Sequence, residues 1–302
     1  MNSLIIANGA AGQRSGDDLA SELRDAFGAD MPRLVKTTGP GDAQKLALDA
    51  ARSGKYRFIY AAGGDGTINE VASGLLAGSD VNSRPILGII PRGTCNVLAS
   101  ELGIPLPGVT EAVDVLRNGR VKYVDVGRAG DRYFLMSVSC GVDAEAVRDV
   151  VLPLKNLVGA GAYLMSGLAA LANYTPSRVT INYDQESISL DAFVVIVANV
   201  STYALSSITV APFAAMDDGW LDICIFEKPP THRIGFIAQV MLLLARRHLG
   251  DPRVRYLRAK RIEIQSDPPI ATQLDGDPIG ETPLTIDVVP RALPILVPST
   301  LA

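Results

Sequence analysis

The stretch Ala61-Ala62-Gly63-Gly64-Asp65-Gly66-Thr67-Ile68-Asn69-Glu70-Val71 decides how the first part of this chain folds. The apolar run 58–61 that leads into it is typical of a buried strand, and the residues from Ile68 onward are typical of a helix. The three glycines between them let the backbone approach a ligand closely. The first N–H groups of the helix and the positive end of its dipole would face that ligand. Thr67 and Glu70 have the spacing of a capping box, which predicts the helix start. We therefore expect an anion cradle at the carboxyl end of a strand.

Asp65 lies inside this cradle, where a bare carboxylate repels a phosphate. It fits the cradle if Mg²⁺ lies between the two, or if it accepts a proton from an attacking hydroxyl. A tight turn with a solvated aspartate is the alternative that the stretch alone leaves open. The pattern is neither the GK[ST] of a Walker A loop nor the GxGxxG of a dinucleotide-binding loop.

The same strand–turn–helix pattern recurs on both sides of the stretch. The run 85–90 is followed by Pro91-Arg92-Gly93-Thr94-Cys95-Asn96, and the run 4–7 is followed by Asn8, Gly9 and Gly12. Gly93, Thr94 and Asn96 would offer amide and hydroxyl groups to the same crevice. The expected strands are 4–7, 33–36, 58–61 and 85–90, and the expected helices are 17–27, 41–53, 68–75 and about 96–102. This alternation predicts a Rossmann-like, doubly wound α/β domain with a parallel sheet, spanning residues 1–120.

Strand-like runs dominate the rest of the chain. They lie at 121–126, 133–138, 179–183, 192–200, 220–226 and 261–264, with helical patterns at 157–172 and 231–247. Turn signals such as Asp217-Asp218-Gly219 separate the strands. We expect a second domain at 121–290, an antiparallel β-sandwich.

Composition excludes several classes of protein. The 302 residues are 48% hydrophobic and 20% charged, which excludes collagen, coiled coils and general disorder. The net charge of -4 argues against a nucleic-acid partner for the molecule as a whole. Three scattered cysteines and two histidines predict neither a disulfide framework nor a His-based metal site. With no secretory or spanning segment apparent, we expect a cytoplasmic protein.

The motifs together resemble those of the diacylglycerol kinase catalytic-domain family, the lipid kinases related to sphingosine and ceramide kinases. The resemblance rests on Gly63-Gly64-Asp65-Gly66-Thr67-x-Asn69-Glu70, on Pro91-x-Gly93-Thr94-x-Asn96, on Ala211-Pro212 with Asp218-Gly219, and on Gln273-Leu274-Asp275-Gly276. These motifs occur in the family's order, and the resemblance runs from about residue 3 to residue 298. It implies an ATP- and Mg²⁺-dependent kinase with a nucleotide-binding α/β domain and a β-sandwich domain for a lipid acceptor. The C-terminal tail, 291–302, is expected to return to the first domain.

The resemblance also implies roles for individual residues. The nucleotide-binding candidates are Asn8, Gly12, Thr37, Gly63, Gly64, Asp65, Gly66, Thr67, Asn69, Glu70, Gly93, Thr94 and Asn96. The catalytic candidates are Asp65, Asp275 and Asp277, with Asp65 and Asp275 ranked first as the base. Asp277 stands where family members usually have Glu.

A structural Mg²⁺ site is implied at Asp218 with the carbonyl groups of Ala215 and Trp220, a turn aspartate being the alternative. The chain departs from the family pattern at Val97, where many members have Asp. We therefore assign no metal ligand there, and the identity of the lipid acceptor stays open.

The acceptor implies contact with a membrane. Between Arg233 and Arg261 there are eight basic residues and one acid, Asp251, with the apolar run 236–244 among them. Such a stretch favours peripheral contact with an anionic surface at the inner membrane face; a core helix followed by a solvated basic strand is the alternative. The apolar segment 152–171 would line a lipid pocket or belong to the core.

Two other functions stay open. A kinase of a soluble acceptor such as NAD shares the GGDG loop, and a non-catalytic lipid-binding protein would use the same fold. A homodimer is also left open.

Overall fold

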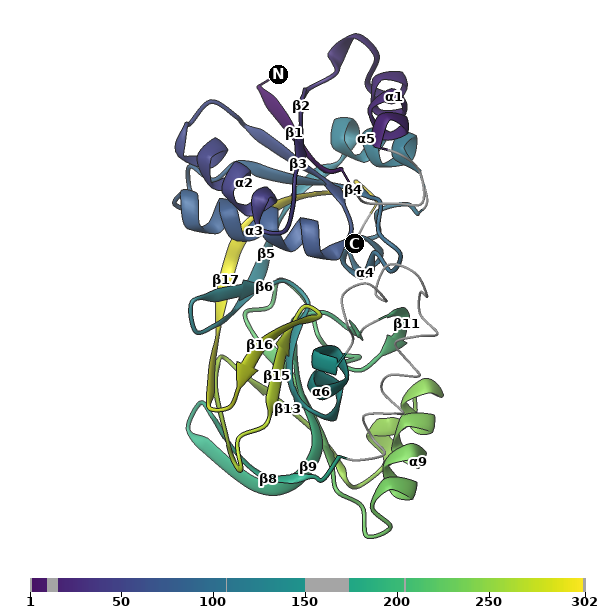
Figure 1. The fold of residues 1–302 in the computed structure, drawn as a ribbon, viewed down its shortest axis with the longest axis vertical. Coiled ribbons are helices and arrows are strands. Elements are labelled where there is room, and N and C mark those ends of the chain that lie inside the picture. The colour runs from purple at the N-terminus through teal and green to yellow at the C-terminus, as the bar shows by residue number, and fades with distance from the viewer. Residues whose placement is uncertain (1, 10–15, 107, 150–173, 204, 301–302) are drawn as a thin grey trace. The chain divides into compact units, whose positions relative to one another are not determined.

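The computed structural model describes residues 2–9, 16–106, 108–149, 174–203 and 205–300 (Figure 1). The chain divides into two compact units. Unit 1 contains Met1–Val126 and Pro290–Ala302, and unit 2 contains Gly127–Val289.

Unit 1 is built around the parallel strands β1 (Ser3–Asn8), β2 (Arg33–Thr37), β3 (Phe58–Gly63) and β4 (Ile86–Pro91). Their order in the sheet is β2-β1-β3-β4. The connecting helices are α1 (Gly16–Phe27), α2 (Asp42–Arg52), α3 (Asp65–Gly78), α4 (Val97–Glu101) and α5 (Val109–Asn118), with the 3-10 turn η1 at Gly28–Asp30. The prediction of a parallel α/β domain is confirmed.

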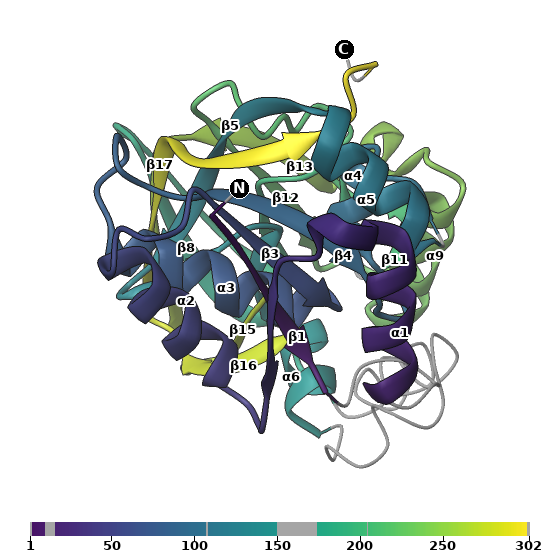
Figure 2. The same ribbon diagram turned by 90° about the horizontal axis from the view of Figure 1, so that it is seen from above.

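Helices cover both faces of this sheet. Figure 2 shows α2 and α3 on one side and α1 and α5 on the other. Alternate strand residues such as Ile5 and Ala7 pack with Leu23 of α1 and with Ala112 and Leu116 of α5. Strands that are buried on both faces need continuous apolar runs, which is why they were recognisable in the sequence.

The parallel register brings the loops of interest to one edge of the sheet. Asn8 pairs with Thr37 at the ends of β1 and β2. Gly63 pairs with Pro91 at the ends of β3 and β4. The carboxyl ends of four strands are therefore neighbours, the usual place for ligands in an open α/β sheet.

Unit 2 is mainly antiparallel. Its larger sheet includes β7 (Ser137–Gly141), β8 (Ser177–Tyr183), β9 (Glu186–Ala198), β12 (Leu221–Glu227), β13 (Val254–Ala259), β14 (Arg261–Asp267), β15 (Ala271–Leu274) and β16 (Asp277–Glu281). A smaller ribbon pairs β10 (Thr202–Tyr203) with β11 (Leu205–Thr209). Among its described residues, unit 2 has the helices α6 (Val142–Asp149) and α9 (Arg233–Leu244) and the 3-10 turn η2 at His248–Gly250. The β-sandwich-like prediction is confirmed for this unit, and its apolar core contains Phe134, Ile181, Val195 and Ile223.

Two long strands contribute to both units. The end of β5 (Arg120–Ala129) pairs with β6 (Arg132–Phe134) in unit 2. The start of β17 (Leu284–Val297) pairs with β14 in unit 2, while Ile295 near its end pairs in parallel with Leu87 in unit 1.

Several predicted boundaries were wrong. Helix α3 begins at Asp65, before the predicted start at residue 68. The predicted strand 133–138 is broken after Phe134 and resumes as β7 at Ser137. The predicted helix 231–247 is shorter, since α9 covers Arg233–Leu244. The predicted helix 157–172 and the apolar segment 152–171 lie outside the described residues.

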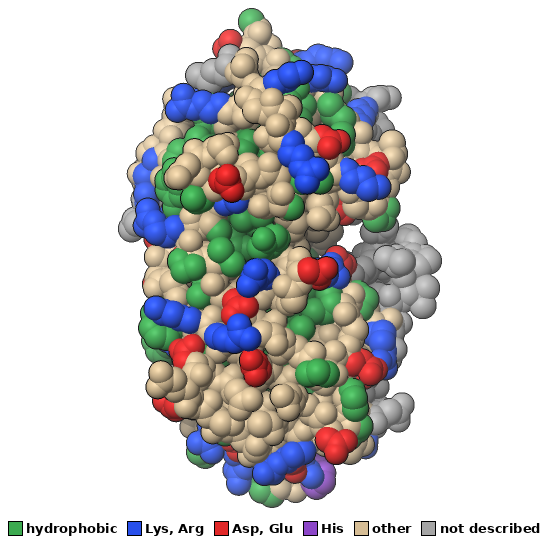
Figure 3. Space-filling model, turned by 90° about the vertical axis from the view of Figure 1, so that its left-hand side faces the viewer, with side chains coloured by type: hydrophobic (Ala, Val, Ile, Leu, Met, Phe, Trp, Pro, Cys, Tyr) green, Lys and Arg blue, Asp and Glu red, His purple; other side chains and the backbone are tan. Residues whose placement is uncertain are grey.

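Within the described part of the chain, no helix is long and apolar enough to cross a bilayer. On the face drawn in Figure 3, basic and acidic side chains are interspersed. This mixture agrees with the small net charge of -4.

Candidate active site

The first turn of α3 is the centre of the glycine-rich loop in unit 1. Its N-cap is Gly64, in an extended conformation with φ -86° and ψ -177°, and no side chain caps it. The predicted capping box is therefore wrong. The Glu70 carboxylate instead accepts hydrogen bonds from the amides of Gly41, at 2.9 Å, and Ala43, at 3.2 Å. Glu70 thus holds the start of α2 rather than its own helix.

Asp65 connects two of the loops. Its carboxylate accepts the amides of Val97 and Leu98, both at 3.1 Å, in the first turn of α4. Burial raises the pKa of Asp65, and the hydrogen bonds from the Leu98 and Val97 amides oppose that rise. Asp65 therefore has a structural role, because it holds the first turn of α4. The sequence suggested two other roles for it, Mg²⁺ binding and proton acceptance.

The glycines allow the loops after β3 and β4 to touch. A Cβ on Gly93 would lie 2.6 Å from the Gly64 Cα, and a Cβ on Gly63 would lie 2.6 Å from the Thr67 Cβ. The Arg92 amide donates to the Gly63 carbonyl at 2.8 Å, which ties the loops together. Gly66 differs, because it is exposed and a Cβ there would meet no protein atom within 4 Å. Packing therefore does not require a glycine at position 66.

The loop after β4 is shaped by Asn96. Asn96 has φ +46°, and its side chain accepts the Gly93 amide at 2.7 Å and donates to the Gly93 carbonyl at 2.8 Å. These bonds close the turn and leave Thr94 exposed at its tip. Val97, where family members often have an acid, is 3% exposed and packs inward.

Two other candidates of unit 1 lie beside the first turn of α3. Asn8 donates its side-chain amide to the Thr67 hydroxyl at 3.2 Å. The Oδ1 atom of Asn69 is buried and has no hydrogen-bond partner among the described residues. Gly12 lies outside the described residues. The strand ends thus bring together the loops that carry Asn8, Thr37, Gly63 to Glu70 and Gly93 to Asn96.

In unit 2, Asp275 lies in the two-residue turn between β15 and β16. Asp275 and Gly276 have φ +47° and +87°, as the Asp-Gly pair of a type I′ hairpin requires. The Asp275 carboxylate accepts the amides of Leu135 at 2.9 Å, Met136 at 3.1 Å and Ser137 at 2.8 Å. These three bonds explain why the strand breaks between β6 and β7.

Asp277 is placed differently. It is the first residue of β16 and is exposed. The turn before it is held from a second side, because the Gly276 amide donates to Gln273 Oε1 at 2.8 Å. The hairpin therefore presents the Asp277 carboxylate on a turn anchored at both Asp275 and Gly276.

A polar cluster around Asp143 supports this hairpin and was missed by the sequence analysis. Gln273 Nε2 donates to the Ser139 hydroxyl at 2.7 Å and to the Tyr203 hydroxyl at 3.1 Å. Both hydroxyls donate in turn to Asp143 Oδ2. Burial raises the pKa of Asp143, while these hydroxyls oppose the rise. The four residues come from β7, β10, β15 and α6, which are far apart in the sequence. The one local signal was Asp143, an aspartate in the first turn of a helix that follows Gly141.

The proposed Mg²⁺ site at Asp218 is arranged around a guanidinium group. Asp218 Oδ1 accepts the Trp220 amide at 3.0 Å, and Oδ2 is bound by Arg258. The same guanidinium lies 3.3 Å from Asp222 and stacks over the Trp220 ring at 5.9 Å. Ala215 is half-buried nearby in the chain. A carboxylate already neutralised by arginine is a poor fit for a divalent cation, so the residues as arranged do not support metal binding here.

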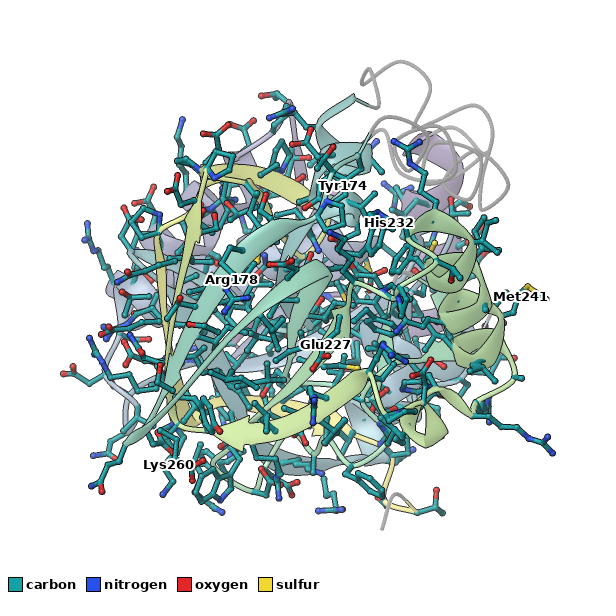
Figure 4. All side chains as sticks on the ribbon, turned by 90° about the horizontal axis from the view of Figure 1, so that it is seen from below. Tyr174, Arg178, Glu227, His232, Met241 and Lys260 are labelled. Carbon is teal, nitrogen blue, oxygen red and sulfur yellow. The ribbon has the colours of Figure 1, made fainter. Side chains whose placement is uncertain are left out.

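A pocket of about 410 Å³ lies in unit 2. It is lined by Tyr174 and Phe193 on one side and by residues 231–234, at the start of α9, on the other. Figure 4 shows Tyr174 and His232 close together at this end of α9. The Tyr174 hydroxyl is buried and has no partner within the described part of the chain.

Each half of the chain matches the model of a known protein family. Residues 2–129 match the diacylglycerol kinase catalytic domain, and residues 136–297 match the YegS C-terminal NAD kinase beta sandwich-like domain. The chain belongs to the diacylglycerol kinase/YegS family of lipid kinases. It is therefore a phosphotransferase, and the resemblance stated from the motifs is confirmed.

Individual relatives agree with this assignment. A diacylglycerol kinase of Bacillus subtilis (strain 168) is 33% identical over 247 residues, covering 82% of this chain and 79% of the relative. A probable YegS-like lipid kinase of Chromohalobacter salexigens is 31% identical over 299 residues, covering 97% and 92%. A crystal structure of a putative diacylglycerol kinase from Bacillus anthracis superposes with a TM-score of 0.80 at 27% identity, covering 99% of this chain and 98% of that one. Membership of this kinase family implies the use of ATP.

Proposed function

We propose that this lipid kinase transfers the γ-phosphoryl group of ATP to the hydroxyl of a membrane lipid of the diacylglycerol or sphingoid type. Unit 1 would bind the nucleotide, and unit 2 would bind the acceptor. The proposed nucleotide site rests on the first turn of α3. Gly66 is exposed there, and no protein atom lies within 4 Å of the position that a Cβ would take. Helix N-termini with unpaired amides favour phosphate, so this open space suits the triphosphate.

We propose Asp277 as the base that receives the proton of the acceptor hydroxyl. The sequence ranked Asp65 and Asp275 first, but the carboxylates of both are hydrogen-bonded to backbone amides. The oxygens of both carboxylates are therefore occupied in holding other segments of their own unit. Asp277 is exposed on the anchored hairpin, where it can reach a substrate. Asp65 and Asp275 would then act as positioning residues, one in each unit.

Magnesium is proposed to reach the protein on the nucleotide. Among the described residues no group of three or more His, Cys, Asp or Glu side chains is arranged to hold a metal ion. The apolar Val97 removes one carboxylate of the family pattern. When bound, Mg²⁺ would neutralise charge on the phosphates during transfer. The residues of unit 1 would contribute backbone amides and the placement of the γ-phosphate.

The acceptor side is proposed to lie at a membrane surface on the cytoplasmic face. Support for the compartment comes from the free thiols of Cys95, Cys140 and Cys224. Support for the surface comes from the excess of arginine between residues 233 and 261. The pocket beside Tyr174 and Phe193 has the size and the aromatic walls that an acyl chain or a glyceryl group would need.

The experiment that tests this function measures ATP turnover with diacylglycerol, sphingosine, ceramide and NAD, for the wild type and for two variants. Asp277→Asn is expected to lower kcat on the preferred lipid by about 10² or more, which is the usual contribution of a general base. Its thermal midpoint should be unchanged, because Asp277 is exposed.

Asp275→Asn is the matched comparison. It removes a carboxylate that holds three amides, so it should lower the thermal midpoint together with activity. Turnover with NAD alone would identify a soluble-acceptor kinase, and no turnover with any acceptor would leave a lipid-binding protein. Near-normal kcat in Asp277→Asn would refute the base assignment.

A further inference from the structure

Apart from Arg233 at its first position, the exposed side chains of helix α9 are all apolar. Ile234 is 75% exposed, Ile237 44%, Met241 61% and Leu244 49%. At 3.6 residues per turn these four positions form one stripe, and the exposed Ala238 and Ala245 border it. Figure 4 shows Met241 directed outward from the helix. A surface helix normally shows the opposite pattern, with polar residues outward.

The inner face of α9 is already fully packed. Phe236 is 6% exposed, and its ring stacks on Phe193 with centroids 4.4 Å apart. Gln239 is fully buried and donates to the Glu227 carbonyl at 3.3 Å. The helix thus directs its one amide side chain inward and its apolar stripe outward. Helix α9 therefore has one face in the core of unit 2, as the core-helix alternative expects, and a second, apolar face in the solvent.

Positive charge surrounds the stripe. Residues 228–250 contain Lys228, Arg233, Arg246 and Arg247 and no Asp or Glu, in a chain whose net charge is -4. Arg233 precedes the stripe, and Arg246 and Arg247 follow it. All three arginines are exposed, and within the part of the chain that the structure describes none of them forms an ion pair. Apolar side chains with arginines at both ends match a surface that is apolar inside and anionic at its head groups.

We propose that α9 is a membrane-docking helix that lies in the plane of an anionic bilayer, with Ile234, Ile237, Met241 and Leu244 among the acyl chains and the flanking arginines at the phosphates. With twelve residues the helix cannot span a bilayer, so it binds along the surface. This proposal rests on the proposed function in one respect: a membrane-lipid acceptor explains why the protein would bind a membrane. Docking itself requires neither ATP nor catalysis.

The test is co-sedimentation of the full chain with vesicles of phosphatidylcholine, with and without phosphatidylglycerol. Wild-type binding should increase with the fraction of phosphatidylglycerol and decrease with added salt. Ile237→Asp/Met241→Asp should weaken binding at least tenfold. Arg246→Gln/Arg247→Gln should abolish most of the dependence on phosphatidylglycerol and salt.

Val81→Asp is the matched control. Val81 is 44% exposed, as Ile237 is, but lies outside α9, so this variant should bind like the wild type. Circular dichroism should show unchanged thermal midpoints, because the substituted side chains are exposed. If the aspartate variant fails to fold, the arginine variant still decides the question.

Activity separates this proposal from the proposed function. The α9 variants should keep turnover on a short-chain acceptor presented below its micelle concentration and lose turnover on the same acceptor type in vesicles. A protein without kinase activity would still show the binding differences. Equal vesicle binding by the wild type and both α9 variants would overturn the proposal. So would a wild-type dimer that the aspartate variant converts to monomers in the absence of lipid, since the stripe would then face a second copy.

Discussion

At the level of single residues, identical side chains in similar motifs have different tasks. Asp65 and Asp275 each follow a strand and each bind backbone amides from another part of their unit. Asp277, two residues after Asp275, is exposed. The glycines divide in the same way, since Gly63 and Gly93 permit close packing whereas Gly66 leaves space.

The glycines lead to a prediction about nucleotide binding. Gly66→Ala should keep or slightly raise stability, because alanine favours a helix by up to about 1 kcal/mol and meets no protein atom. It should weaken ATP binding about tenfold or more if the triphosphate occupies the open space. Gly63→Ala should instead lower the free energy of unfolding by about 1–3 kcal/mol through overpacking against Thr67. Calorimetric titration and urea unfolding check both; unchanged ATP affinity in Gly66→Ala would place the nucleotide elsewhere.

Asp65→Asn tests the structural role of that carboxylate. The amide has one acceptor oxygen, so its NH₂ group would face the amide of Val97 or Leu98. We expect a loss of about 1–3 kcal/mol in the free energy of unfolding, as for a buried donor left unpaired. Urea unfolding provides the measurement. Lost turnover with unchanged stability would instead show that Asp65 acts in the chemistry.

At the level of elements, the helices of unit 1 are positioned by side chains from other elements. Glu70 of α3 holds the amides at the start of α2, and Asp65 holds those at the start of α4. In unit 2, α9 is held by an aromatic and an amide side chain on its inner face. Helix starts and helix faces in this chain therefore depend on long-range partners.

Glu70→Ala follows from this arrangement. Removal of the carboxylate leaves the Gly41 and Ala43 amides without their acceptor and removes a negative charge near the start of α2. Lost caps of this kind cost about 0.5–2 kcal/mol. The thermal midpoint should decrease while the KM for ATP changes less than in Gly66→Ala. A selective rise in that KM with an unchanged midpoint would argue for direct contact with the nucleotide, as the sequence suggested.

At the level of the whole molecule, stability should depend on a buried histidine. His248 is 2% exposed, its Nε2 atom lies 3.0 Å from the Val210 carbonyl, and its ring stacks near Phe226. Desolvation lowers the pKa of His248 below 6.5, although the Val210 carbonyl opposes this. The unfolded chain therefore binds a proton near pH 6.5 that the folded protein does not bind, and stability decreases as the pH falls through that range.

The slope that one such group contributes is at most about 1.4 kcal/mol per pH unit. Urea unfolding at pH 7.5 and pH 5.5 should show less acid destabilisation in His248→Gln than in the wild type. Burial raises the pKa values of Asp65, Asp143 and Asp222, so these groups act with the opposite sign. These three aspartates are present in both proteins. The difference in pH dependence of stability between His248→Gln and the wild type therefore reports on His248 alone. Equal pH dependence in the two proteins would contradict its assignment as a buried neutral group.

Much of unit 1 was predictable because its signals are local. Parallel strands buried on both faces appear as short apolar runs, and β1, β3 and β4 lie where those runs are. The glycine loops could be predicted because the residues that form each turn are close together in the sequence. Helix α5 was not anticipated, although its buried residues Val109, Ala112, Val113 and Leu116 have the spacing of one helix face. The strands after β14 were not anticipated either.

The sequence by itself determined the fold class, the kinase family and the loops at the carboxyl ends of the strands, because each depends on residues that are near one another in the chain. Only the tertiary structure decided what the polar side chains bind. In the folded protein the Glu70 carboxylate binds the amide of Gly41 at the start of α2. The Asp275 carboxylate binds the Ser137 amide, where the predicted strand is interrupted. The apolar side of α9 faces the solvent. These outcomes depend on contacts between residues far apart in the chain, which periodicity and spacing do not encode.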